Sequence, residues 1–286
     1  DNKFQYTIRP LEAWPEYVAC EQLQAEAWQM PDYRESVPAA LLKVSQQNGG
    51  ILLGAFDSRD QLVGFVYGIL GMEDHAEGRR LKHHSHMLAV SPEWRRTGLG
   101  LALKFAQREQ LIAQGIELAT WTFDPLQAAN ARLNLVRLGA IARHYLVNAY
   151  GEMKDALNSG LASDRFEVEW WVNSPRVHAC AAGQRVEYEW NDEYCIFDLD
   201  ENPKGLPEIR KVSEMADDAV LVEIPEDINA LKRADLELCK DWRMKTREVF
   251  LQAFVDGLVA TGLAQKQEKG RSRVAYVLTR EDIFAV

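Results

Sequence analysis

The spacing of apolar positions in the first 150 residues predicts a regular succession of strands and helices. Apolar runs of roughly four to eight residues indicate strands, whereas apolar residues that recur every three or four positions indicate helices that bury one face. The order of these segments predicts a mixed α/β fold. The pattern predicts strands at 5–10, 50–56, 61–72, 83–90, 117–123 and 140–147, and helices at 15–29, 37–48, 98–114 and 125–139.

The remainder of the chain is less regular and predicts a second α+β lobe. A polar segment at 151–165 with two glycines indicates a linker. We therefore divide the chain into a domain at 1–150 and a C-terminal extension of unknown role at 151–286. In the extension, strands are predicted at 166–172, 185–190, 195–199, 219–224 and 274–278, and a long helical tract at 227–261.

Composition and charge limit the class of protein. The 286 residues are 47% hydrophobic and carry a net charge of −10, which argues against a general binder of nucleic acid or anionic membranes. No apolar run approaches the length of a membrane span, and no N-terminal segment resembles a signal peptide. The cysteines have neither metal-type nor redox-type spacing, which is typical of reduced thiols in a cytosolic protein: Cys20, Cys180, Cys195 and Cys239.

One stretch of this acidic chain is basic. Between residues 79 and 108, seven basic residues stand against one acid, Glu93, and two glycines lie among them at the predicted joint between a strand and a helix. The basic residues are Arg79, Arg80, Lys82, Arg95, Arg96, Lys104 and Arg108. We interpret the stretch as a candidate site for a small anion that carries several phosphates, with a solvated loop as the alternative.

The joint at residues 95–100 has the pattern R-x-x-G-x-G. The first N–H groups of a helix lack intrahelical partners and carry a partial positive charge, so a loop that turns its amides inward forms an anion site. Glycine lets the backbone approach the ligand where a Cβ atom would collide. Neither a Walker A loop nor a full G-x-G-x-x-G fingerprint is present.

The segment MLAVSPEWRRTGLGLAL resembles the acetyl-coenzyme A binding segment of the GNAT acyltransferase superfamily, whose members carry [Q/R]-x-x-G-x-[G/A] after their fourth strand. The resemblance is strongest at 83–151 and rests on element order at 1–82. It implies the GNAT fold with an additional C-terminal α+β lobe, as in a group of bacterial predicted acetyltransferases. It also implies that Leu88, Ala89 and Val90 pair with the pantetheine arm, and that the pyrophosphate is held by the amides of Arg95, Arg96, Thr97, Gly98, Leu99 and Gly100.

The helix predicted at 125–139 carries a polar stripe beside an apolar one. The apolar stripe is Leu126, Ala129, Leu133 and Val136, and the polar stripe contains Asn130 and Asn134. In the superfamily an asparagine on this helix contacts pantetheine, which implies that role for Asn130, with Asn134 one turn later. The alternative is that both are exposed surface amides.

The chain departs from the superfamily where many members place a tyrosine that protonates the departing thiolate. The corresponding residue is Leu135, and Tyr145 and Tyr150 lie beyond the next turn, so the general acid stays unassigned. A thiol with a pKa of about 8.5 is a reasonable leaving group without one.

An amine acceptor needs a base, because an alkylammonium with a pKa of about 10.4 cannot attack a thioester. His84 and His86 share a strand face, and HSHMLAV resembles the H-x-H-x-L-A-V stretch of arylalkylamine N-acetyltransferases, whose paired histidines help remove the amine proton. Glu73 and Asp74 are alternative bases. The histidines also fit a structural role, or a metal site completed by Glu73, Asp74 or His144.

We therefore expect a cytosolic N-acyltransferase that transfers an acyl group from acetyl-coenzyme A, or another acyl-coenzyme A, to an amine of a small molecule or peptide by direct attack. Neither a metal cofactor nor a nucleic-acid or membrane partner is expected. A non-catalytic acyl-coenzyme A sensor and, as a minor alternative, a metal-dependent hydrolase stay open. A homodimer is also open, and the acceptor and acyl length are not fixed.

Overall fold

The computed structural model describes residues 4–28, 36–76, 78–151, 160–216, 218–268 and 270–280. The chain divides into two compact units, one formed by residues 1–121 with 171–173 and the other by 122–170 with 174–286. The predicted boundary after residue 150 stays a prediction, and most of the predicted linker, residues 152–159, lies outside the described residues. No helix in the described ranges is both long and apolar enough to cross a membrane.

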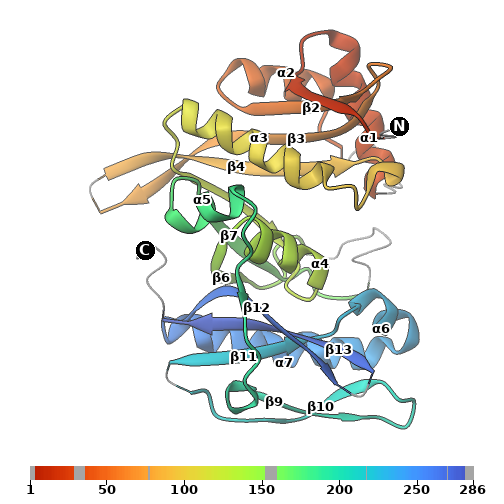
Figure 1. Ribbon diagram of the computed structural model, residues 1–286, viewed down its shortest axis with the longest axis vertical. Helices are drawn as coiled ribbons and strands as arrows, with labels where there is room; N and C mark the ends of the chain where they lie inside the picture. Colours follow the sequence, from red (N-terminus) through yellow and green to blue (C-terminus); the bar gives the residue numbers. More distant parts are fainter. Residues whose placement is uncertain are drawn as a thin grey trace. The chain divides into compact units, whose positions relative to one another are not determined.

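The first unit is built on an antiparallel sheet in the order β1-β2-β3-β4, with β5 parallel to β4. The strands β3 and β4 form a long hairpin that pairs from Gly64↔Val90 to His75↔Gly78 (Figure 1). This hairpin is longer than the predicted strands. The elements are β1 (Tyr6–Pro10), α1 (Trp14–Trp28), α2 (Ala39–Gln47), β2 (Ile51–Asp57), β3 (Leu62–His75), β4 (Gly78–Val90), the 3₁₀ turn η2 (Pro92–Trp94), α3 (Leu99–Ala113) and β5 (Leu118–Phe123).

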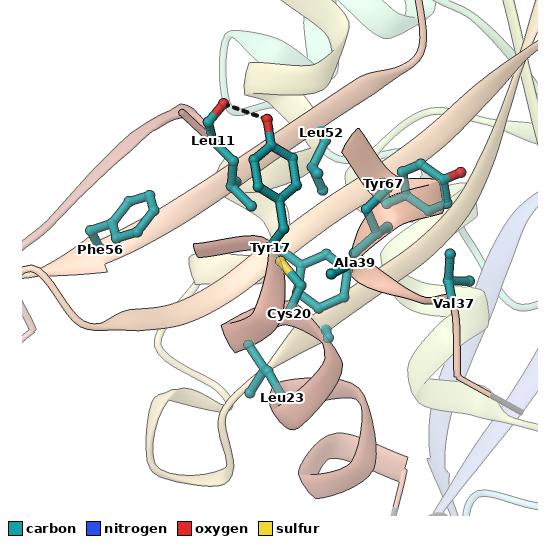
Figure 2. Close-up of a cluster of buried hydrophobic side chains, with 12 residues drawn as sticks. Leu11, Tyr17, Cys20, Leu23, Val37, Ala39, Leu52, Phe56 and Tyr67 are labelled. Carbon is teal, nitrogen blue, oxygen red and sulfur yellow. Dashed lines mark hydrogen bonds between the residues drawn. The ribbon is translucent and has the colours of Figure 1, made fainter. Parts of the chain in front are cut away.

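Helices cover both faces of this sheet. On one face, buried side chains of α1, α2 and strands β2 to β4 form a single apolar cluster, part of which Figure 2 shows. Tyr17 of α1 lies in this cluster, and its hydroxyl donates to the Leu11 carbonyl at 3.1 Å. On the other face, a Cβ atom at Gly64 would lie 3.2 Å from side-chain atoms of Leu99 and Leu103, so α3 packs there against β3.

The second unit contains strands in the order β7-β6-β12-β13-β11, with β8 beside β12 and a separate β9–β10 hairpin. Its elements are α4 (Ala128–Ala131), the π-helical turn η3 (Arg132–Arg137), β6 (Ile141–Leu146), β7 (Arg165–Trp171), α5 (Pro175–Ala181), β8 (Glu187–Tyr188), the 3₁₀ turn η4 (Asp192–Tyr194), β9 (Phe197–Glu201), β10 (Pro207–Val212), β11 (Ala219–Ile224), α6 (Ile228–Ala234), α7 (Leu236–Val255), β12 (Val259–Glu268) and β13 (Arg271–Thr279).

The helical tract predicted at 227–261 is wrong as a single helix. Asp235 is extended, with φ −158°, and its carboxylate accepts the Leu238 N–H at 3.1 Å, so it separates α6 from α7 and caps α7. Gly257, with φ +83°, follows the end of α7 and precedes β12. The mixed α/β class predicted from the sequence is confirmed.

Candidate functional site

The turn between β4 and α3 has the backbone shape of an anion site. Arg96 has φ +64° and Gly98 has φ +92°, so two left-handed residues fall within three positions. The Thr97 hydroxyl donates to the Trp94 carbonyl at 2.7 Å and closes the turn on itself. Left-handed residues in such turns let successive amides face a common point, which favours anion binding.

The amides at the start of α3 are available to a ligand. No side chain caps this helix, and the Ala102 N–H is the first to bond back into the helix, at 3.0 Å from the Gly98 carbonyl. The N–H groups of Leu99, Gly100 and Leu101 therefore have no intrahelical acceptor, and the helix dipole makes this end positive.

The two glycines of the motif differ in what the protein itself requires of them. Gly98 adopts a left-handed conformation that L side chains rarely adopt. At Gly100, a Cβ atom would meet Leu88 at 3.7 Å and Val90 at 3.8 Å, which is ordinary van der Waals contact. Packing within the protein thus does not demand glycine at position 100.

The two arginines of the turn differ as well. The Arg95 guanidinium donates to the Ala27 carbonyl of α1 at 2.8 Å, so its side chain ties the turn to that helix. The Arg96 side chain is exposed and, over the described residues, makes no hydrogen bond or ion pair. Arg96 is therefore the better candidate for direct contact with phosphate.

The outer edge of β4 presents backbone groups at two of the three predicted positions. The Ser91 N–H donates to the Val63 carbonyl at 2.9 Å, and the register pairs Phe65 with Ala89. Because hydrogen-bonded pairs alternate in antiparallel ladders, Ala89 bonds to β3, whereas Leu88 and Val90 direct their N–H and C=O groups to the opposite edge. There, parallel pairing with β5 is confined to His83↔Ala119 and His84↔Thr120 within the described residues.

A β-bulge in β4 lies at the histidine pair. Tyr67 pairs with Met87 and Gly68 with Ser85, so His86 is the extra residue on β4. The ring centroids of His84 and His86 lie 6.2 Å apart, so the structure brings the two predicted bases together. The bulge shifts the alternation that follows, because Met87 packs beside Ala89 on the α1/α2 face while Leu88 and Val90 lie toward α3.

A tyrosine that the sequence did not single out completes this cluster. The Tyr67 ring packs edge-on against His86, with centroids 6.0 Å apart, and its hydroxyl lies 2.7 Å from the Ser45 hydroxyl of α2. Tyr67 sits in an apolar strand and reads as a core residue, so only the register of β3 against β4 could have placed it here.

Both histidines of the pair favour the neutral form. Burial lowers the pKa of His84 to about 4, with smaller contributions from His86 and from nearby lysines. Burial also lowers the pKa of His86. At neutral pH both rings are therefore able to accept a proton. The His84 Nδ1 atom lies 3.4 Å from the Thr120 hydroxyl, which is a long hydrogen bond.

The third histidine of this strand, His83, has a structural role on the opposite face. The Gln107 amide Oε1 accepts from Lys104 at 2.8 Å and from Ser85 at 3.0 Å, so its Nε2 group donates to His83 Nε2 at 3.1 Å. This pattern makes His83 an acceptor and keeps it neutral, and burial lowers its pKa to about 3. A Cβ atom at Gly68 would lie 2.1 Å from His83 Nε2, which explains the glycine there.

Glu73 is held apart from the histidine pair. It pairs in register with Arg80, and the two side chains form an ion pair of 2.9 Å. Arg80 also stacks over the Trp171 ring, 4.6 Å from its centroid. His84 pairs with Ile69, four residues before Glu73 on β3, which is about 13 Å along a strand. Asp74 forms an exposed ion pair with Arg79 at 2.9 Å.

The predicted asparagines lie in the second unit and differ in exposure. Asn130 is exposed on α4, whereas Asn134 is buried on η3. The π-helical bonding of residues 132–137 replaces the 3.6-residue period, so the predicted stripes are wrong in part: Ala129 is exposed and Asn134 is covered. The Asp124 carboxylate accepts the Leu126 N–H at 2.8 Å, and Gln127 is the N-cap residue of α4.

The tyrosines that follow are engaged within the second unit. The Tyr145 hydroxyl donates to Asp164 at 2.6 Å, and burial raises its pKa. The Tyr150 hydroxyl lies 2.9 Å from the Thr122 hydroxyl. Leu135, at the family's tyrosine position, is fully buried. Within the described ranges, His, Cys, Asp and Glu side chains form no group of three that could hold a metal ion.

Comparison of the sequence with known protein families identifies the region that contains this site. The family model for the acetyltransferase (GNAT) family matches residues 13–138. Residues 13–138 are a GNAT acetyltransferase domain. The turn at Arg95–Gly100, the β4 edge and the histidine pair all lie within the matched residues, and the acyl donor of this family is acyl-coenzyme A.

Solved structures that resemble the chain include other acetyltransferases. One is the ribosomal-protein-S18-alanine N-acetyltransferase of Escherichia coli, with 16% identity and a TM-score of 0.44 over 59% of this chain and 94% of that one. Another is a GNAT-family acetyltransferase of Streptococcus pneumoniae, with 13% identity and a TM-score of 0.46 over 58% of this chain and 98% of that one. No curated protein matches the sequence.

Proposed function

We propose that the GNAT domain transfers an acetyl group from acetyl-coenzyme A to a primary amine of a small molecule or peptide. The observation that carries the proposal is the turn before α3, where Arg96 and Gly98 are left-handed and the amides of residues 99–101 lack intrahelical acceptors. The diphosphate of coenzyme A matches such a positive, concave backbone site. The proposed contacts come from the amides of Arg95 to Gly100 and from the Arg96 side chain.

The outward N–H groups of Leu88 and Val90 supply the next part of the proposed site. They lie on the edge of β4 that β5 leaves unpaired, which supports strand-like pairing with the pantetheine arm. A backbone N–H at this edge also stabilises the oxyanion that develops on the thioester carbonyl.

The proposed chemistry is direct attack without a covalent enzyme intermediate. His84 and His86, neutral at pH 7, accept a proton from the ammonium group, and the free amine attacks the thioester carbon. The C–N bond forms, the C–S bond breaks, and coenzyme A leaves as a thiolate. The second proton of the attacking nitrogen passes through water to this thiolate, which gives the neutral amide and the coenzyme A thiol. Because a base with a pKa of about 4 is a weak acceptor for an alkylammonium proton, His84 serves best as one member of a relay with His86 and water.

We also propose that the protein is located in the cytoplasm. All four cysteines are free in the structure: Cys20, Cys180, Cys195 and Cys239. Reduced thiols are typical of cytosolic proteins.

The test is release of the coenzyme A thiol when the full chain is mixed with acetyl-coenzyme A and a panel of primary amines. The proposal predicts thiol release that depends on both substrates. Calorimetric binding of coenzyme A without amine-dependent release would instead identify an acyl-coenzyme A sensor. Absence of coenzyme A binding would remove the proposal.

A further inference from the structure

A cavity of about 530 Å³ lies within the second unit, in the C-terminal lobe. Its walls come from the β9–β10 turn, the segment between β11 and α6, one face of α6, the start of α7 and the β12–β13 turn. None of the predicted site residues of the GNAT domain lines it. Cavities of this size with mostly apolar walls are the usual form of small-molecule sites.

The inner wall of this cavity is apolar. It is formed by side chains such as Leu206, Ile224, Leu231 and Trp242. The Trp242 indole N–H donates to the Pro207 carbonyl at 2.9 Å, so the ring has no free donor, and its side chain is almost wholly buried. Such walls favour an apolar ligand body.

The charged residues that line the rim of the cavity leave it with a net negative charge. Arg273 forms a bidentate pair with Glu223 at 2.9 and 2.6 Å, and Arg271 pairs with Glu201 at 3.0 Å. Both guanidinium groups that line the cavity are thus neutralised. The remaining lining charges are Glu226 and Asp227, both exposed, and neither forms an ion pair over the described residues.

We propose that this cavity binds a small amphipathic amine, with its apolar body against the inner wall and its ammonium group beside Glu226 and Asp227. The proposal concerns the C-terminal lobe alone and does not depend on acyl transfer. Small side chains on the facing side of α6, at Ala230 and Ala234, leave the space that the ligand fills.

The test is calorimetric titration of the full chain, without acetyl-coenzyme A, using 2-phenylethylamine as the probe. The matched probes 2-phenylethanol and 3-phenylpropanoate replace the cation by an uncharged and an anionic group. We expect the amine to bind about two- to five-fold more tightly than the alcohol, as one favourable charge pair near the surface allows. Carboxylate binding as tight as amine binding would overturn the proposal.

Three variants assign the binding to this cavity. The double variant Glu226→Gln, Asp227→Asn removes the charges while Asn keeps the helix cap that Asp227 supplies to Ala230 at 2.9 Å, and it should bring the amine to the affinity of the alcohol. Ala230→Leu, which fills the cavity, should abolish binding of both. Amine binding that persists in both cavity variants and is lost only in His84→Gln, His86→Gln would belong to the GNAT domain and would refute the cavity proposal.

Discussion

The rings of His84 and His86 lie with their centroids 6.2 Å apart, although His86 is the extra residue of a β-bulge. Without the bulge, the strand after His86 would turn Met87 toward α3 and Leu88 toward α1 and α2. Regular alternation places both imidazoles on one face, and the bulge sets which backbone groups of β4 beyond them face the open edge.

Removal of both histidines should slow acyl transfer in a way that depends on the basicity of the acceptor. The variant His84→Gln, His86→Gln should lower kcat/KM for an alkylamine by about 100-fold or more, as loss of a general base does. An acceptor whose own pKa lies below 5 has no proton to lose before attack, so it should lose much less. Glu73→Gln is the control, because Glu73 is paired with Arg80, and equal loss in this variant would contradict the assignment.

The pH dependence of the reaction should lack the inflection of an ordinary histidine. Burial lowers the pKa of His84 to about 4 and also lowers that of His86, so both rings favour the neutral form at pH 7. With an acceptor whose pKa lies below 5, kcat/KM should be flat from about pH 7 to 8. An inflection between about pH 6 and 7 would show that one ring titrates as in free solution.

The substitution Gly100→Ala should weaken coenzyme A binding without lowering the stability of the protein. A Cβ atom there makes only ordinary contacts at 3.7 and 3.8 Å, and alanine is favoured over glycine in a helix by up to about 1 kcal/mol. We expect unchanged or raised stability together with a loss of coenzyme A affinity of about ten-fold or more. Gly71→Ala on β3, whose nearest contact is 3.6 Å, is the matched control and should bind normally. Normal affinity in Gly100→Ala would mean that no ligand approaches this backbone.

Substitution of the two arginines of the turn should have different effects, on coenzyme A binding for Arg96 and on stability for Arg95. Arg96→Asn keeps a residue that tolerates the left-handed backbone and removes the unpaired guanidinium, so it should weaken coenzyme A binding and reduce its dependence on salt. Arg95→Gln should lose the bond to Ala27 and cost about 1 kcal/mol of stability, with a smaller effect on binding. Calorimetry at two salt concentrations measures both, and a larger binding loss in Arg95→Gln would reverse the assignment.

The buried His83 should destabilise the protein in acid. Its folded pKa of about 3 lies below the unfolded value of about 6.5, so the unfolded state binds the proton first and stability falls as pH drops through that window. The slope is about 1.4 kcal/mol per pH unit for one such group. Urea unfolding from pH 6.5 to 4.5 should show a shallower decline in His83→Gln than in the parent protein. His144→Gln, at an exposed site, should leave the slope unchanged.

Periodic apolar segments and turn residues specify many strands and helices locally, so the sequence predicted these well. The strands predicted at 50–56 and 219–224 and the helix that starts near Gly98 appear as expected. By contrast, the tract at 227–261 was expected to be helical throughout, whereas the capping carboxylate of Asp235 divides it and α7 ends at Val255, before Gly257. Strand β12 follows on directly and gains its partners from β13, which no local pattern shows.

For the candidate site, the sequence located the turn and the histidine pair but not their partners. The Arg80 pairing of Glu73 and the Ala27 bond of Arg95 depend on strand register and helix packing between distant segments. The burial of Asn134 follows from π-helical bonding, which a 3.6-residue period cannot predict.

The central claim is that the amides at the start of α3 hold the diphosphate of coenzyme A, and a crystal structure of the full chain with bound acetyl-coenzyme A tests it most directly. We expect diphosphate oxygens within about 3.2 Å of backbone nitrogens of residues 96–100. A diphosphate bound elsewhere, with these amides bonded to the protein's own side chains, would contradict the account.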